Sequence, residues 1–223
     1  GTSMNSAFMS LIGESEVILQ KTINSPEHYH RNEETLIARG RWMLESGLFT
    51  YGFSRWPVWD VKIPSDVFTF TCLRDPFKRL FSRYRQLKGY NTGVHQEKFR
   101  SDRPDHAKLM NDDFYAFVKD APRQEVNHSL YLFSETCDVK IAFDSANKLD
   151  YFYFVENIEE GFKEMAKASQ LPLKYHWKNK SGYKEPLSES VKAEVIRDYL
   201  QEEYEFFELM KEEYARRHGK VPF

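Results

Sequence analysis

Hydrophobic residues recur with two different periods in the middle of the chain. Residues Val67–Leu73 form a run of β-branched and aromatic residues without clear polar alternation, which is typical of a strand covered on both faces in a parallel sheet. Helical spacing follows, with apolar residues at Phe77, Leu80, Phe81, Tyr84 and Leu87. Between the two runs stand Asp75, a favourable N-cap, and Pro76, which is favoured at the first helical position. The pattern therefore predicts a strand that turns directly into a helix ending near Lys88.

Further helices and strands are expected on either side of this unit. Helices are expected over Ser6–Leu19, Glu33–Leu48 (ended by Gly47), Asn157–Ser169 (started by Asn157 and Glu160) and Ser188–His218 (ended by Gly219 and Pro222), strands over Val139–Phe143 and Tyr151–Val155, and a loop over Asn24–Asn32. Strands that alternate with helices predict an α/β fold, a three-layer sandwich with a mainly parallel central sheet. Residues 1–223 are expected to form a single domain.

Composition narrows the class of protein. The 32 Lys and Arg residues nearly balance the 34 Asp and Glu residues, so neither a basic nucleic-acid coat protein nor an acidic disordered chain is expected. Two cysteines cannot form a disulfide framework, and no Cys/His set has the spacing of a metal site. No signal peptide or membrane span is recognisable, which favours a cytoplasmic location. The alternative is a luminal catalytic domain without its anchor.

Charge is distributed unevenly along the chain. Residues Arg74–Lys88 contain six basic residues and one acid, whereas Glu189–Glu213 contains nine acids and three bases and is interpreted as a solvated helix face. Arg74 ends the predicted strand, and Ser82 lies two turns into the following helix. In α/β folds ligands bind at the carboxyl ends of parallel strands, and a helix N-terminus there attracts anions. An arginine and a hydroxyl add hydrogen bonds to phosphate oxygens, so the segment indicates a phosphate-bearing ligand.

The segment Leu73–Tyr84 resembles the R-D-P-x-x-R-x-x-S-x-Y element of sulfotransferases, which have a P-loop-like nucleotide-binding fold. In that family the element holds the 3′-phosphate of 3′-phosphoadenosine 5′-phosphosulfate. The resemblance implies that Arg74 and Ser82 bind this phosphate, and that Arg79 and Tyr84 support the helix and its packing.

Two later stretches are similar to the same family. Tyr151–Ile158 is similar to a strand and helix start of its carbohydrate-type members, and His176–Ser188 resembles the basic loop that closes over the nucleotide. The resemblance implies that this loop binds the nucleotide. Its residues suit that role by charge, hydroxyl or aromatic stacking: Lys180, Ser181, Tyr183 and Lys184, with Trp177 as an alternative to Tyr183 for stacking on adenine.

The 5′ side of the nucleotide is held in this family by a loop that resembles P-K-T-x-G-T-S. The chain begins Gly1-Thr2-Ser3, which we interpret as the end of that loop, with the strand and the lysine before it missing. The alternative is that these three residues are a cloning remnant ahead of an initiating Met4. As the end of the loop, Gly1, Thr2 and Ser3 contribute to the donor site.

A general base is not identified by the family pattern, because the stretch Phe49–Trp56, where members carry a histidine, has none. His128 and His30 are the leading candidates, with His28 and Glu34 as alternatives.

The sequence thus predicts transfer of a sulfuryl group from 3′-phosphoadenosine 5′-phosphosulfate to a hydroxyl of a polar acceptor, a small molecule or a glycan. No nucleic-acid partner is expected. The rival interpretations are a P-loop kinase, a non-catalytic binder of nucleotides or polyanions, and a sulfotransferase that has lost its base. The polar segments Gly89–Asp120 and Asn24–Asn32 are expected to line the acceptor pocket.

Overall fold

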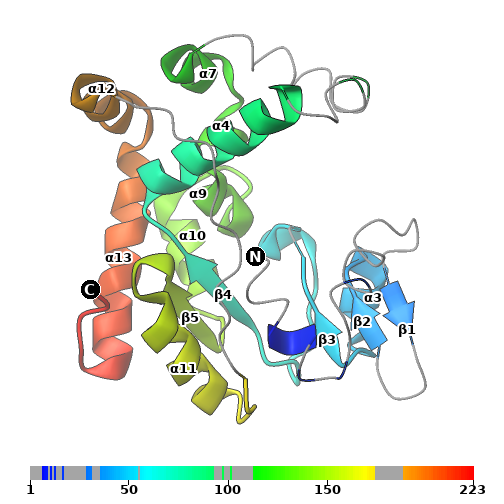
Figure 1. Ribbon diagram of the computed structural model, residues 1–223. Coiled ribbons are helices and arrows are strands. Elements are labelled where there is room, and N and C mark those ends of the chain that lie inside the picture. Colours follow the sequence, from blue (N-terminus) through cyan, green and yellow to red (C-terminus); the bar gives the residue numbers. More distant parts are fainter. Residues whose placement is uncertain are drawn as a thin grey trace.

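A computed structural model of the chain describes residues 7–9, 11, 13, 17, 29–31, 36–54, 56–92, 97, 101, 113–173 and 188–223 (Figure 1). The strands are β1 (Tyr29–Arg31), β2 (Leu36–Ala38), β3 (Tyr51–Gly52), β4 (Phe70–Leu73) and β5 (Tyr151–Phe154). The helices are α3 (Arg41–Ser46), α4 (Pro76–Thr92), α7 (Phe114–Asp120), α8 (Arg123–Val126), α9 (His128–Phe133), α10 (Val139–Ala146), α11 (Ile158–Ala168), α12 (Glu189–Tyr199) and α13 (Gln201–His218), with the 3-10 turns η1 (Val58–Asp60) and η2 (Val155–Asn157).

Strands β4 and β5 lie at the centre and are parallel, as the sequence predicts. They pair in register from Phe70 opposite Tyr151 to Leu73 opposite Phe154. Strand β4 occupies only the second half of the predicted run, and its side chains are mostly half-buried, whereas β5 is buried along its whole length. Both strands therefore end at the same edge of the sheet, where β4 leads into α4 and β5 leads into η2.

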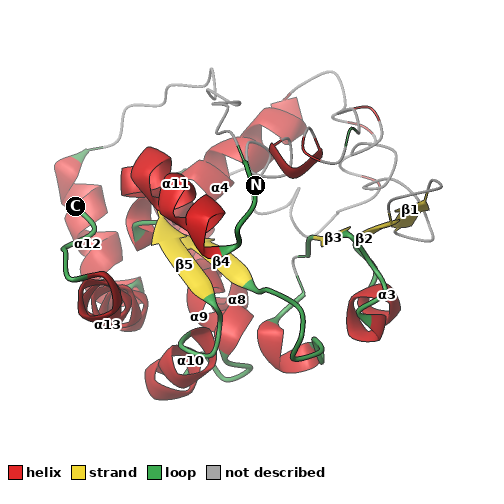
Figure 2. Cartoon of the chain, turned by 90° about the horizontal axis from the view of Figure 1, so that it is seen from below, coloured by secondary structure: helices red, strands yellow, loops and turns green. Residues whose placement is uncertain are grey.

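Helices cover both faces of β5 (Figure 2). Successive side chains of the strand point to opposite faces, so neighbouring residues contact different helices. Tyr153 packs with Phe162 of α11 on one face, and Phe154 packs with Phe207 of α13 on the other. Helix α11 approaches the strand so closely that a Cβ atom on Gly161 would lie 2.6 Å from Cβ of Tyr153. A glycine is required at this crossing.

A second hydrophobic cluster lies beside the sheet. The predicted apolar face of α4 is buried, and Leu80 and Tyr84 pack against Phe114 and Phe117 of α7 and Val195 of α12. Helix α7 belongs to the segment expected to line the acceptor pocket. Its apolar side is instead part of the core.

Strands β1, β2 and β3 form a separate small sheet, in which β2 is antiparallel to β1 and parallel to β3. Phe8 connects this sheet to the central pair, since its ring stacks on Tyr51 of β3 at 4.4 Å and on Phe70 of β4 at 5.5 Å. Residues 7–9, 11 and 17 are helical, in agreement with the helix predicted over Ser6–Leu19; its other residues lie outside the described ones, except Gly13, which is in a turn.

The prediction for Glu33–Leu48 is partly wrong. Leu36–Ala38 forms a strand, and the helix begins only at Arg41 and ends at the predicted Gly47, which adopts a left-handed conformation. A short apolar run fits a helix and a strand equally well, and pairing with β1 and β3 decides for the strand. The loop expected over Asn24–Asn32 contains β1, because Tyr29–Arg31 pairs with β2 despite its polar composition.

The strand predicted over Val139–Phe143 is wrong, because this segment is the start of helix α10. Asp138 caps the helix by accepting a hydrogen bond from the backbone N–H of Ile141 at 2.8 Å. Ala142 and Ala146, one turn apart, are fully buried against neighbouring helices. The capping residue and the small buried pair outweigh the β preference of Val139 and Ile141.

The helix that starts at Asn157 is confirmed as α11, but its N-terminus differs from the predicted capping box. The side chain of Asn157 caps no N–H of the helix and donates instead to the carbonyl of Pro222 at 2.8 Å. Glu160 pairs with Lys220 at 2.9 Å. Both residues are recruited by the C-terminal segment, which passes this end of the helix.

The long final helix is interrupted at Leu200, which is buried and has non-helical backbone angles (φ −116°, ψ 6°). Ser188 caps the start and Gly219 ends α13, as predicted. The interpretation of its acidic residues as solvated is wrong at two positions, because Glu203 and Glu213 are buried.

The α/β class is therefore established, with small parallel pairings and helices on both faces of the central one. Within the described residues the central sheet has two strands, so the larger sheet of a three-layer sandwich stays a prediction. None of the helices in the described part of the chain combines the length and apolar character needed to cross a bilayer.

Candidate functional site: the junction of strand β4 and helix α4

The junction between β4 and α4 has the geometry that the sequence predicts. Asp75 precedes the first turn of α4, and its Oδ1 accepts a hydrogen bond from the backbone N–H of Lys78 at 2.8 Å. The backbone N–H of Arg79 closes the turn on the carbonyl of Asp75 at 2.9 Å. The N-terminus of a 17-residue helix thus lies at the carboxyl end of a parallel strand, where α/β proteins bind anions.

Arg74 connects the strand to this helix and is half-buried. Its Nε is inaccessible to solvent and has no hydrogen-bond partner among the described residues. A buried donor without a partner is costly, especially on a charged group, and native proteins rarely keep one without a reason. An anion bound at the junction would satisfy it, so Arg74 fits a phosphate ligand.

Ser82 and Lys78 lie on α4 one turn apart and on the same side of the helix. Lys78 is exposed and Ser82 is half-buried, whereas Leu80 and Tyr84 point into the core. The predicted pair of Arg74 and Ser82 is therefore carried by one strand–turn–helix element, and the side of α4 bearing Ser82 is not its core face.

Arg79 has a different environment, although it belongs to the same motif. Its Nε and Nη2 donate to the two carboxylate oxygens of Glu203 at 3.0 Å each, and Nη2 also donates to the carbonyl of Val126. Glu203 is fully buried and accepts a further hydrogen bond, from the backbone N–H of Ser129 at 3.0 Å. Arg79 thus joins α4 to α13 and α9. The prediction that Arg79 supports the helix is confirmed.

Other residues of the basic segment are also occupied by contacts within the protein. Arg83 pairs with Glu125 at 2.6 Å, and the ammonium of Lys88 donates to the hydroxyl of the buried Tyr84 at 2.7 Å. Among the described residues, no carboxylate forms an ion pair with Arg74 or Lys78. Positive charge available to a ligand is therefore concentrated at the start of α4.

Two contacts that the sequence did not reveal hold Asp75. Its backbone N–H donates to Oε1 of Glu156 at 3.2 Å, and its Oδ2 accepts a hydrogen bond from the hydroxyl of Tyr204 at 3.0 Å. Glu156 follows β5, so its place beside the junction was recoverable from the parallel pairing of the strands. Tyr204 lies 129 residues from Asp75, and no pattern in the sequence connects them.

Cys72, near the end of β4, lies close to charged groups of both signs at the junction. Burial raises the pKa of the Cys72 thiol to about 12, and the charges of Glu156 and Arg74 act on the same group in opposite directions. The thiol therefore remains protonated and unreactive near neutral pH. Oε2 of Glu156 is buried and has no hydrogen-bond partner within the described part of the chain.

His128 is the first residue of α9 and is half-buried. Burial, and then the nearby positive charges of Arg79 and Arg83, lower its pKa below the usual value for histidine, while Glu125 opposes them. The imidazole is therefore neutral near pH 7 and able to accept a proton. The charges of Arg79 and Arg83 act on it, so it lies near the part of α4 that carries these two arginines.

The side chains of the other predicted site residues lie outside the described part of the structure. His30 lies on β1 opposite Ile37, and its side chain is not among the described ones. Outside the described residues lie the two predicted loops and the alternative bases: Gly1, Thr2, Ser3, Trp177, Lys180, Ser181, Tyr183, Lys184, His28 and Glu34. Their roles stay predictions. The described residues contain no group of three or more His, Cys, Asp or Glu side chains arranged to hold a metal ion.

Comparison with known proteins assigns the chain to a family. Searches of curated protein sequences and of solved structures give no match. The family model described as "Sulfotransferase family" matches residues 1–213, which is nearly the whole chain and includes both β4 and α4. Because the match extends over nearly the whole chain, the chain belongs to the sulfotransferase family.

Proposed function

We propose that the protein transfers a sulfuryl group from 3′-phosphoadenosine 5′-phosphosulfate to a hydroxyl of a polar acceptor, with carbohydrates as the first class to test. Membership of the sulfotransferase family makes it a transferase of sulfuryl groups. The proposal adds the donor and the acceptor class. The observation that carries it is the buried Nε of Arg74, which lacks a partner among the described residues at the N-terminus of α4.

In this proposal Arg74 and Ser82 bind the 3′-phosphate of the donor. A guanidinium forms charge-assisted hydrogen bonds to phosphate oxygens, and the helix N-terminus adds a partial positive charge. Lys78 contributes long-range attraction, because it is exposed on the same side of the helix as Ser82. These groups fix one end of the nucleotide and so orient its sulfuryl group toward the acceptor.

The remaining roles rest on the family resemblance. Gly1, Thr2 and Ser3 are assigned to the 5′ side of the donor, and Lys180, Ser181, Tyr183 and Lys184 to a loop that covers it. His128 and His30 are the candidates for the base that removes the acceptor proton. The neutral state of His128 supports the first of them. The larger parallel sheet of a P-loop-like sandwich belongs to the same proposal.

The test of the donor site is the substitution Arg74→Ala, followed by calorimetric titration with 3′-phosphoadenosine 5′-phosphate. We expect binding to weaken by about 1.5–3 kcal/mol, the contribution of a hydrogen bond to a charged group. Arg123→Ala is the control, because Arg123 is an exposed arginine on α8 whose ion pair with Glu202 lies at the surface. Equal affinities of Arg74→Ala and wild type would remove Arg74 from the site.

The main alternative is a non-catalytic protein of the same fold that binds nucleotides or polyanions through its basic residues. Such binding would fall steeply with salt and show no preference for a 3′-phosphate. Incubation with the labelled donor and a panel of hydroxyl acceptors separates the two functions. A labelled product establishes transfer, whereas tight nucleotide binding without any product favours the alternative.

A further inference from the structure

The first turn of α13 is attached to the β4–α4 junction at two neighbouring positions. Tyr204 donates its hydroxyl hydrogen to Oδ2 of Asp75 at 3.0 Å, and Glu203, the residue before it, receives the guanidinium of Arg79. The other oxygen of Asp75 caps α4. The carboxylate of Asp75 therefore joins the N-terminus of α4 to the N-terminus of α13.

Asp75 follows Arg74 directly, so these contacts also fix the backbone from which the Arg74 side chain leaves. The backbone N–H of Asp75 donates to Glu156. The side-chain carboxylate of Asp75 accepts hydrogen bonds from the hydroxyl of Tyr204 on one oxygen and from the N–H of Lys78 on the other. Burial and the charge of Asp75 raise the pKa of Tyr204, so the phenol remains a hydrogen-bond donor over the physiological range.

The hydroxyl of Tyr204 can be removed without disturbing the packing of α13. Tyr204 is half-buried and contacts the junction through one polar atom, whereas the packing of α13 on the sheet depends on Phe206, Phe207 and Met210. Loss of the Tyr204 hydroxyl therefore removes a constraint on Asp75 while leaving the ring and the core in place. The constraint acts on the residue that directly follows Arg74, whose Nε lacks a partner among the described residues.

We propose that Tyr204 is a positioning residue for recognition of the 3′-phosphate, acting through Asp75 on Arg74. The inference rests on the proposed function, because it assumes that Arg74 binds this phosphate. Tyr204 itself does not touch the ligand. Its hydrogen bond holds the start of α4 in the orientation that directs the side chain of Arg74 toward the anion.

The experiment is a double-mutant cycle with Tyr204→Phe and Arg74→Ala, read by calorimetric titration with 3′-phosphoadenosine 5′-phosphate. We expect Tyr204→Phe to weaken binding about tenfold in the wild-type background, somewhat less than loss of a direct charged contact. In the Arg74→Ala background the same change is expected to have less than about a twofold effect, because residues that act through one another are not additive. A purely structural role would give equal effects in both backgrounds.

Tyr199→Phe is the matched control, since Tyr199 is also half-buried, lies at the end of the adjacent α12 and contacts Tyr115 instead of the junction. It is expected to bind like wild type.

Asp75→Asn keeps one oxygen for the cap and is the second variant should Tyr204→Phe unfold. The same loss of affinity is expected. Wild-type affinity in both Tyr204→Phe and Asp75→Asn, or equal effects in both backgrounds, overturns the inference. Absence of 3′-phosphoadenosine 5′-phosphate binding by the wild-type protein instead overturns the proposed function.

Discussion

Two arginines of one motif illustrate how the surroundings of a side chain decide its role. Arg79 donates to both oxygens of the buried Glu203 and to a backbone carbonyl, so its charge is neutralised within the protein. Arg74, five residues earlier, leaves a buried donor without a partner among the described residues. We therefore expect Arg74→Ala to keep the unfolding temperature of the wild type. Removal of Arg79 would leave Glu203 as an uncompensated buried charge, which is strongly destabilising.

His128 is a candidate for the base that removes the acceptor proton, and its substitution tests that role. If His128 is the base, His128→Asn is expected to lower kcat by about 10²–10⁴-fold, the usual contribution of a general base, while affinity for 3′-phosphoadenosine 5′-phosphate stays unchanged. Its lowered pKa places the acidic limb of the pH profile of kcat/KM below pH 6.5, because a base is active only in its neutral form. Steady-state kinetics with the labelled donor measures both quantities.

His30→Asn provides the comparison. A selective loss of kcat in His30→Asn, with His128→Asn behaving as wild type, would transfer the role to His30.

Among the elements, the contact between α11 and β5 depends on a single small residue. Helix α11 presents Gly161 to Tyr153 of the strand, and Phe162 and Met165 continue the buried face beside it. The packing fixes β5 between two layers of helices. Since β5 is the parallel neighbour of β4, it also supports the strand that carries Arg74.

Gly161→Ala is expected to destabilise the protein by about 1–3 kcal/mol, the usual cost of adding a methyl group to a closely packed interface. The added Cβ would lie 2.6 Å from Cβ of Tyr153, which cannot swing away because its Cβ is attached to the strand backbone. Urea unfolding followed by circular dichroism measures the loss. Gly89→Ala is the control, because Gly89 lies in helix α4 and has no heavy atom within 4 Å of an added Cβ. A Gly161→Ala variant as stable as wild type would contradict the close crossing.

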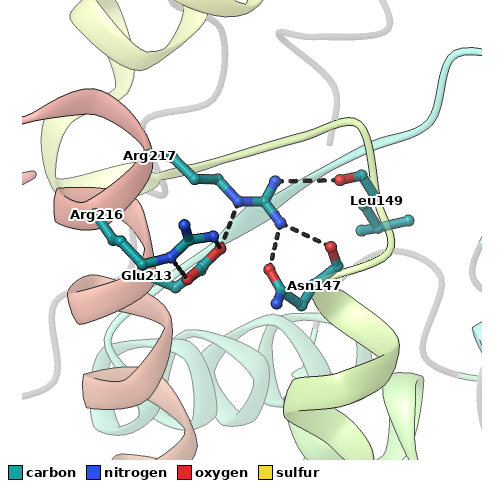
Figure 3. A network of polar contacts seen from close by, with 5 residues as sticks. All are labelled: Asn147, Leu149, Glu213, Arg216 and Arg217. Atoms are coloured by element: carbon teal, nitrogen blue, oxygen red, sulfur yellow. Dashed lines mark hydrogen bonds and ion pairs between the residues drawn. The ribbon is translucent and has the colours of Figure 1, made fainter.

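For the molecule as a whole, a network of polar contacts around the buried Glu213 joins the end of α13 to the segment that leads into β5 (Figure 3). Glu213 accepts hydrogen bonds from Arg216 and Arg217, at 2.6–2.7 Å. Arg217 in turn donates to the carbonyl of Leu149 at 3.2 Å and to both the carbonyl and the side chain of Asn147. Asn147 is the C-cap residue of α10 and Leu149 lies just beyond the helix, so Arg217 caps the end of α10 through the carbonyl of Asn147.

This network predicts a defined dependence of stability on pH. The hydrogen bonds from Arg216, with Arg217 adding to them, hold the pKa of Glu213 at about 2, below its usual value of about 4.3. A pKa that is lower in the folded than in the unfolded state gives a stabilisation that is complete above about pH 4.3 and is lost as the pH falls through about 2. Glu213→Gln is therefore expected to reduce the free energy of unfolding by about 1–3 kcal/mol at pH 7.

The difference between Glu213→Gln and wild type is expected to shrink steadily as the pH falls below 4.3, since the wild-type carboxylate is then increasingly protonated in the unfolded chain. Chemical unfolding at pH 7, 5 and 3.5 gives the three values. Glu208→Gln is the matched control, because Glu208 forms an exposed pair with Lys211 on the same helix, and little change is expected. A pH-independent difference would show that the charge of Glu213 is not what stabilises the network.

The sequence by itself determined those features that depend on neighbouring residues. The order of strand, Asp-Pro cap and helix around Arg74 follows from local hydrogen bonding and side-chain period, and so do the caps at Ser188 and Gly219. The motif Leu73–Tyr84 sufficed to indicate the family. Short segments with equal preference for two states, such as Leu36–Ala38 and Val139–Phe143, were not determined in this way, because pairing and burial decide between the states.

Only the tertiary structure decided which distant groups meet. The hydrogen bond from Tyr204 to Asp75, the burial of Glu203 under Arg79 and the capping of α10 by Arg217 join residues between 68 and 129 positions apart. Local propensity acts over a few residues, and a polar side chain on a helix carries no mark of the partner that packing will bring to it. The family motif was therefore recognisable in a short stretch of sequence, whereas the contacts that orient Asp75 and the start of α4 depend on how α13 packs against the junction.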